Sequence, residues 1–138
     1  MQQATLAEIK TAVDRLAQVI GADPKSDSMP TYGRTEDSGR PHIEVDSRGY
    51  HYVVSERGNE NKRITTPELG ELLYQTLEAA ASSLSSRYAA KHRMAGKDFR
   101  RPMFQHEVEL MTKISPEWGQ RCAARLDGIL REHPFVDR

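Results

Sequence analysis

The chain has 138 residues, and its 20 Lys and Arg side chains balance 20 Asp and Glu side chains, so the formal net charge at pH 7 is zero. This balance argues against a nucleic-acid backbone or an anionic membrane as the main partner, because both attract excess positive charge. Cys122 is the only cysteine, which excludes an internal disulfide and a zinc site made of several cysteines. The length suits a single domain over residues 1–138. No apolar run approaches the ~20 residues of a membrane span, and the start lacks a signal-peptide pattern, so we expect a cytoplasmic protein.

The first helix is predicted over residues 5–20. Thr5 and Glu8 have the spacing of a capping box, apolar residues follow at intervals of three and four, and Gly21 is the expected stop. Residues 22–41 are rich in Pro, Gly, Ser and Asp, which predicts an irregular segment with at most a short extended piece around Tyr32.

A small antiparallel sheet is predicted next. Residues 42–46 alternate polar and apolar side chains, residues 50–57 are rich in strand formers, and Lys62–Thr65 would add a third strand. A two-residue turn gives the register that separates the faces best, although a turn with a glycine bulge is an alternative. That register places on one face Ile43, Val45, Tyr50, Tyr52 and Val54, and on the other His42, Glu44, Asp46, His51 and Ser55.

Three further helices are predicted after the sheet. Thr66 and Pro67 form a capping pair that begins a long helix ending near Gly96, and a third helix begins at about Asp98. Ser115 and Pro116 repeat the capping pair before a fourth helix, which Pro134 ends. The predicted class is α+β: an N-terminal helix, a three-stranded antiparallel meander, and a bundle of about three helices packed on it. The long helix is the expected cover of one sheet face.

Catalytic and cofactor patterns are sparse. The sequence has no phosphate-binding glycine loop and no dinucleotide fingerprint, and we expect no cofactor, no metal and no catalytic residue. His106 and Glu109 could supply two metal ligands, but a surface pair is favoured because metal sites need three or four ligands. Cys122 lies among apolar positions and is expected in the core rather than as a nucleophile.

The predicted polar sheet face offers one acid–base alternative. His51 could pair with Glu44 or Asp46, but a solvated face with cross-strand polar pairs is favoured.

Two charge clusters could face a partner. The basic one could bind phosphate, which would make the protein a nucleic-acid-binding regulatory module using residues 87–101; the favoured interpretation is that these cations lie at two helix ends. The acidic one could face a basic partner, or be solvated surface. The basic cluster contains Arg87, Lys91, Arg93, Lys97, Arg100 and Arg101, and the acidic one Glu36, Asp37, Glu44 and Asp46.

The segment from Pro41 to Trp118 resembles a family of bacterial immunity proteins from polymorphic toxin systems, the type numbered 63. The resemblance lies in the stretches HIEVDSRGYHYVVSERG, TTPELGELLYQTLEAA and RYAAKHRMAGKDFRRPMFQHEVELMTKISPEW. Its most specific parts are Glu56-Arg57-Gly58, Glu71-Leu72-Leu73-Tyr74, Asp98-Phe99-Arg100-Arg101, and Glu109-Leu110 with Trp118.

The resemblance implies a small cytoplasmic antidote without enzymatic activity, which binds and neutralises the C-terminal domain of a toxin delivered by contact or secretion. From charge logic we expect a nuclease toxin with a basic cleft that an acidic patch would occlude. The residues expected to bind the toxin are Tyr32, Glu36, Asp37, Glu44, Asp46 and His51. A set of motif residues is expected to form structural ion pairs instead: Glu56, Arg57, Asp98, Arg100 and Arg101.

Overall fold

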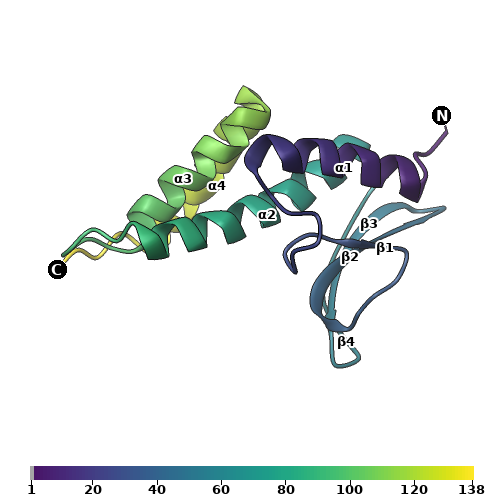
Figure 1. The fold of residues 1–138 in the computed structure, drawn as a ribbon, viewed down its shortest axis with the longest axis horizontal. Coiled ribbons are helices and arrows are strands. Elements are labelled where there is room, and N and C mark those ends of the chain that lie inside the picture. The colour runs from purple at the N-terminus through teal and green to yellow at the C-terminus, as the bar shows by residue number, and fades with distance from the viewer. Residues whose placement is uncertain (1) are drawn as a thin grey trace. The chain divides into compact units, whose positions relative to one another are not determined.

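The computed structural model describes residues 2–138 and contains two compact units, Met1–Ala79 and Ala80–Arg138. The first holds the N-terminal helix, the whole sheet and the start of α2; the second holds the end of α2 and the last two helices (Figure 1). The elements are α1 (Leu6–Ile20), β1 (Thr31–Tyr32), β2 (Ser38–Asp46), β3 (Gly49–Glu56), β4 (Asn59–Thr66), α2 (Leu69–Lys91), α3 (Arg100–Ile114) and α4 (Pro116–Glu132). The α+β class is confirmed. Within residues 2–138, no helix combines the length and hydrophobicity that crossing a bilayer requires.

The local signals of α1 are confirmed. The Thr5 hydroxyl accepts the Glu8 N–H at 3.1 Å, and the Glu8 carboxylate accepts the Thr5 N–H at 2.9 Å, which completes the capping box. Gly21 ends the helix with a left-handed φ of 74°. The buried stripe of α1 includes Ile9 and Val13, and the helix packs against β2. From the sequence, the long helix after Pro67 was expected to cover the sheet, and the packing of α1 against β2 was not predicted.

The sheet has four strands in the order β1-β2-β3-β4, and it is mixed rather than an antiparallel meander of three. β1 pairs with β2 in parallel, with Thr31 opposite His42 and Tyr32 opposite Ile43. The strands β2 and β4 are also longer than predicted, since β2 begins at Ser38. The prediction missed these parts because Gly and Pro before His42 read as loop, and a two-residue strand has no periodicity.

The predicted register between β2 and β3 is confirmed. Asp46 pairs with Gly49 across a two-residue turn, so Ile43 lies opposite Tyr52 and Glu44 opposite His51. Gly49 has a φ of 126°, and a Cβ added there would lie 2.5 Å from the Thr66 carbonyl oxygen. Only glycine fits this position, because the end of β4 approaches its backbone directly.

The second unit is built around the α3–α4 helical hairpin, whose two helices lie side by side in Figure 1. Ser115 ends α3 and caps α4: its N–H donates to the Met111 carbonyl, and its hydroxyl accepts the Trp118 N–H. Pro116 occupies the first turn of α4, as predicted. The buried side chains of this hairpin include Leu110, Met111, Cys122 and Leu126.

Candidate binding face of the sheet

One face of the sheet in the first unit gathers charged and polar side chains from three strands. Successive strand residues point to opposite faces, so the pairing places Glu44, His51 and Thr65 on the same side. We call this the charged face; it consists of His42, Glu44, Asp46, His51, Arg63 and Thr65, with Arg48 and Glu60 at its ends. Three residues predicted from sequence to bind a partner, Glu44, Asp46 and His51, therefore lie together.

Asp46 and His51 form the first of two histidine–carboxylate pairs on the charged face. The Nε2 atom of His51 lies 2.7 Å from Asp46 Oδ1, and its Nδ1 atom lies 2.8 Å from Thr65 Oγ1. Arg48 Nη2 donates to Asp46 Oδ2 at 2.8 Å. The hydrogen bonds from Arg48 and His51 hold the pKa of Asp46 well below its usual range, so this carboxylate is ionised at neutral pH.

The sequence left open whether an acid–base pair of His51 would use Glu44 or Asp46, and in the structure His51 pairs with Asp46. The imidazole is fully buried, and both of its nitrogens have partners. A carboxylate, an imidazole and a hydroxyl in series also occur in hydrolases. Here the buried ring links β2, β3 and β4 through side chains, which is the arrangement of a cross-link that stiffens the sheet.

His42 and Glu44 form the second pair. His42 Nε2 lies 2.7 Å from Glu44 Oε2, and Arg63 Nη1 donates to Glu44 Oε1 at 3.3 Å. Arg63 also donates to the Glu60 carboxylate at 2.7 Å through Nη2. The bond from His42, followed by the attraction of Arg63, lowers the pKa of Glu44. The charged face therefore displays three carboxylates, of Glu44, Asp46 and Glu60, that stay ionised and are held in fixed positions.

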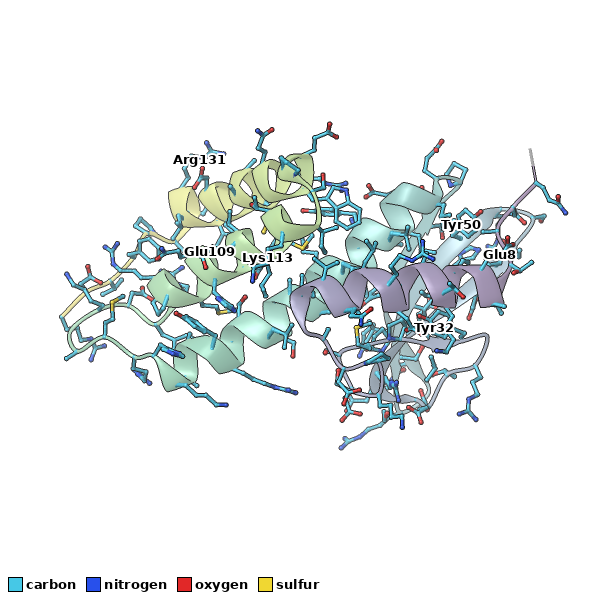
Figure 2. All side chains as sticks on the ribbon, turned by 45° about the horizontal axis from the view of Figure 1, so that its top comes forward. Glu8, Tyr32, Tyr50, Glu109, Lys113 and Arg131 are labelled. Carbon is cyan, nitrogen blue, oxygen red and sulfur yellow. The ribbon has the colours of Figure 1, made fainter. Side chains whose placement is uncertain are left out.

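The other residues predicted to bind a partner lie elsewhere in the first unit. Tyr32, which is labelled in Figure 2, pairs with Ile43, so it lies on the opposite side of the sheet from Glu44. Burial raises the pKa of Tyr32, and Lys10 Nζ lies 6.0 Å from its ring centroid. Glu36 forms an ion pair with Arg40 at 3.1 Å. Tyr32 therefore does not lie on the charged face, and Glu36 pairs with Arg40 rather than with a residue of that face.

Asp37 braces the turn between β3 and β4. Its carboxylate accepts the Gly58 N–H at 2.6 Å, and its carbonyl accepts the Arg57 N–H at 3.1 Å. Arg57 and Gly58 have φ values of 54° and 78°, so this turn needs two consecutive left-handed residues. The motif Glu56-Arg57-Gly58 thus lies at a turn, and Asp37 supplies its distant support.

The motif Asp98-Phe99-Arg100-Arg101 lies in the second unit and holds the C-terminal segment. Arg100 pairs with Asp98 at 3.0 Å and donates to the carbonyls of His133 and Pro134. Arg101 pairs with Asp137 at 2.8 Å. Two of the six cations in the predicted basic cluster are therefore neutralised by local carboxylates.

The remaining sequence candidates also lie in the second unit. His106 Nδ1 lies 3.8 Å from Glu109 Oε2, and the His106 ring stacks on Tyr88 with 3.9 Å between ring centroids. Cys122 is fully buried, with its Sγ atom 3.4 Å from the Glu107 carboxylate. A fully buried thiol lacks the solvent exposure of a reactive cysteine.

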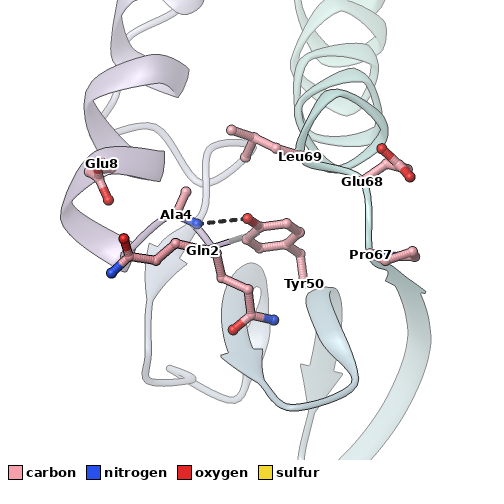
Figure 3. A pocket seen from close by; sticks show the side chains of 8 residues that line it. Gln2, Ala4, Glu8, Tyr50, Pro67, Glu68 and Leu69 are labelled. Atoms are coloured by element: carbon pink, nitrogen blue, oxygen red, sulfur yellow. Dashed lines mark hydrogen bonds between the residues drawn. The ribbon is translucent and has the colours of Figure 1, made fainter.

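A polar cavity of about 570 Å³ opens where the N-terminal segment meets the first turn of α2 (Figure 3). The Tyr50 hydroxyl lines it and accepts the Ala4 N–H at 2.8 Å, which ties this segment to β3. Glu8 and Glu68 contribute the carboxylates of its lining. The hydrogen bond from the Thr5 backbone N–H lowers the pKa of Glu8, so this carboxylate of the lining already serves the capping box of α1.

Sequence reasoning missed Arg63 and Glu60 as members of the charged face. Glu60 lies outside the predicted strand Lys62–Thr65, whereas β4 begins at Asn59 and carries a register shift where it meets Val54 and Ser55. Arg63 lies inside the predicted strand, but no register of that strand against residues 50–57 was predicted. A bulge changes which side chains share a face, and its position has no periodic signal in the sequence. His42 was placed on the correct face, but its pairing with Glu44 was not anticipated.

Comparisons with known proteins identify the family. A family model described as immunity protein 63 matches residues 46–128, which is more than half of the chain. The match begins at Asp46 on the charged face and extends over β3, β4, α2 and α3 into α4. The comparison with curated proteins and the comparison with solved structures each found no match. The chain belongs to the immunity protein 63 family.

Proposed function

We propose that this protein neutralises a cognate bacterial toxin domain by binding it tightly, without catalysis of its own. The observation that carries the proposal is the family match over residues 46–128. The partner is the C-terminal domain of a contact-delivered or secreted toxin, met in the cytoplasm, and neither nucleic acid nor a membrane takes part. The whole chain, residues 1–138, acts as one inhibitory domain.

We further propose that the charged face contacts the toxin. The side chains of Glu44, Asp46 and Glu60 are 38%, 39% and 45% exposed, so their oxygens can reach a partner while their bonds to Arg and His hold them in place. Prearranged side chains lose less conformational freedom on binding, which favours affinity. A stable complex of this kind buries roughly 1,600 Å² in total.

We also propose that the toxin is a nuclease and that this protein blocks its substrate cleft. A cleft that binds phosphodiester carries basic side chains, and the charged face has three carboxylates against the guanidinium groups of Arg48 and Arg63. Complementary charges of this kind raise the association rate more than they change the dissociation rate.

Co-expression with the toxin-like C-terminal domain encoded by the neighbouring open reading frame tests the proposal. We expect restored growth, and nanomolar or tighter binding of the purified proteins by calorimetry. If the wild-type protein neither rescues growth nor binds this domain, toxin neutralisation is refuted.

A matched pair of charge reversals tests the surface. Glu60→Lys changes the charged face, and Glu132→Lys makes the same change at the end of α4 in the second unit. We expect Glu60→Lys to weaken binding at least about tenfold, mostly through slower association, and Glu132→Lys to leave it nearly unchanged. Equal affinity of Glu60→Lys and wild type would exclude the charged face.

A further inference from the structure

We infer that His42 is a positioning residue, which holds the Glu44 carboxylate ready to accept hydrogen bonds from a basic side chain of the toxin. The inference rests on the proposed function and names the chemistry of one contact within it: a guanidinium or ammonium group of the partner against Glu44. Glu44 would make the contact, and His42 would act through it.

The hydrogen bonds that Glu44 accepts within the protein use only part of the hydrogen-bonding capacity of its carboxylate. His42 reaches Oε2 at 2.7 Å and Arg63 reaches Oε1 at 3.3 Å, so each carboxylate oxygen has one protein donor. An ionised carboxylate can accept about four hydrogen bonds, which leaves capacity for about two more. Because the Glu44 side chain is 38% exposed, that capacity is available to a planar donor pair from another molecule.

The burial of the His42 ring and the hydrogen bonding of its two nitrogens argue that His42 does more than stabilise the fold. Its side chain is 4% exposed, and its buried Nδ1 atom has no hydrogen-bond partner among the described residues. A buried polar atom without a partner costs stability, which offsets the gain from the bond at Nε2. The effect of His42 that is left is on its neighbour, because the hydrogen bond at Nε2 restricts the orientation of the Glu44 carboxylate.

The charges around this pair follow from the same contacts. The Nε2 atom of His42 lies against one oxygen of Glu44, and the lowered pKa of Glu44 keeps this carboxylate ionised at neutral pH. The charged groups that face this pair are Arg63, from β4, and Glu60, which Arg63 also binds. The ionised Glu44 carboxylate is therefore the group that a basic side chain of the partner would contact.

Two substitutions of nearly equal volume test the inference. His42→Gln keeps an N–H donor near the position of Nε2, whereas His42→Met removes it. Both remove the orphaned Nδ1 atom, so a purely structural role predicts similar or better stability for His42→Met. A positioning role predicts instead that the toxin affinity of His42→Met falls by several-fold to about tenfold, the expected effect of freeing one side chain, while His42→Gln stays close to wild type.

The test has one readout that needs no toxin. In an NMR titration of the carboxyl carbons, the lowered pKa of Glu44 should move back toward its ordinary value in His42→Met and remain lowered in His42→Gln. A second readout is a double-mutant cycle on toxin binding. If His42 acts through Glu44, His42→Met should add no further loss in a Glu44→Ala background.

The outcomes are distinguishable. A wild-type protein that fails to bind the toxin domain refutes the proposed function and this inference together. Normal wild-type binding with unchanged affinity of His42→Met, or an unchanged pKa of Glu44 in that variant, overturns the inference alone. Additive losses in the double-mutant cycle would also overturn it, because His42 would then contribute independently of Glu44.

Discussion

Gly119 of α4 lies directly against Thr112 of α3, and Gly119→Ala should destabilise the protein. A Cβ at this position would lie 2.9 Å from the Thr112 Cβ and 3.0 Å from the Thr112 Cα, and it would overlap the Thr112 hydroxyl. Non-bonded carbon atoms ordinarily lie about 3.5–4.0 Å apart, so the two helices would have to separate by roughly 1 Å at this point. Flexible side-chain motion cannot relieve the overlap, because the nearest atoms include the Thr112 backbone.

The magnitude is a balance of two effects. Overpacking of a buried contact costs about 1–3 kcal/mol, and the approach to backbone here favours the upper end. Replacing Gly by Ala inside a helix gains about 1 kcal/mol. The net expectation is a loss of about 2 kcal/mol in the free energy of unfolding, or a shift of roughly 1 M in the urea midpoint.

Gly128→Ala is the matched control in the same helix. A Cβ at Gly128 meets only the Arg131 Nη2 atom at 3.7 Å, which is an ordinary separation. This variant should therefore gain up to about 1 kcal/mol from helix propensity.

Urea unfolding followed by circular dichroism measures both variants against wild type. Adding Thr112→Ala to Gly119→Ala should restore only part of the loss, because it removes the overlapping hydroxyl while the crowding by the backbone and first side-chain carbon of residue 112 persists. A Gly119→Ala protein as stable as wild type would show that α3 and α4 do not approach as closely as this geometry requires.

Three further outcomes are expected. Burial lowers the pKa of His106 below about 6.5, so protonation of this side chain opposes folding. The free energy of unfolding should therefore be highest above that pH and fall as the pH drops below it. In urea titrations at pH 7.5 and 5.5, His106→Gln should reduce this loss. The Arg101 guanidinium, followed by the Asp98 backbone N–H, lowers the pKa of Asp137 to about 2. The ionised Asp137 should therefore stabilise the fold above about pH 4, and this stabilisation should vanish as the pH falls toward about 2. In Asp137→Asn, the free energy of unfolding should depend less on pH over this acid range. Replacing the fully buried His51 by Ala should cost about 2–4 kcal/mol, since a cavity forms and Asp46 loses a donor; thermal unfolding at the wild-type midpoint would contradict the cross-link.

The sequence by itself determined the features that depend on neighbouring residues. The capping box of Thr5 and Glu8, the shared cap at Ser115 and the two-residue turn between Asp46 and Gly49 all follow from short-range rules. The alternation of polar and apolar residues also placed Glu44, Asp46 and His51 on one face. The family resemblance noted over the segment from Pro41 to Trp118 agrees with the family model that matches residues 46–128.

Only the tertiary structure decided what each of those side chains contacts. The parallel strand β1, the bond from Gly58 to Asp37 and the pairing of Arg63 with Glu44 join residues 10 or more positions apart. Such contacts depend on how loops close and where a bulge shifts a register, and neither leaves a periodic pattern in the chain. An exposed acidic strand could therefore be predicted, but the buried histidine that orients Glu44 could not.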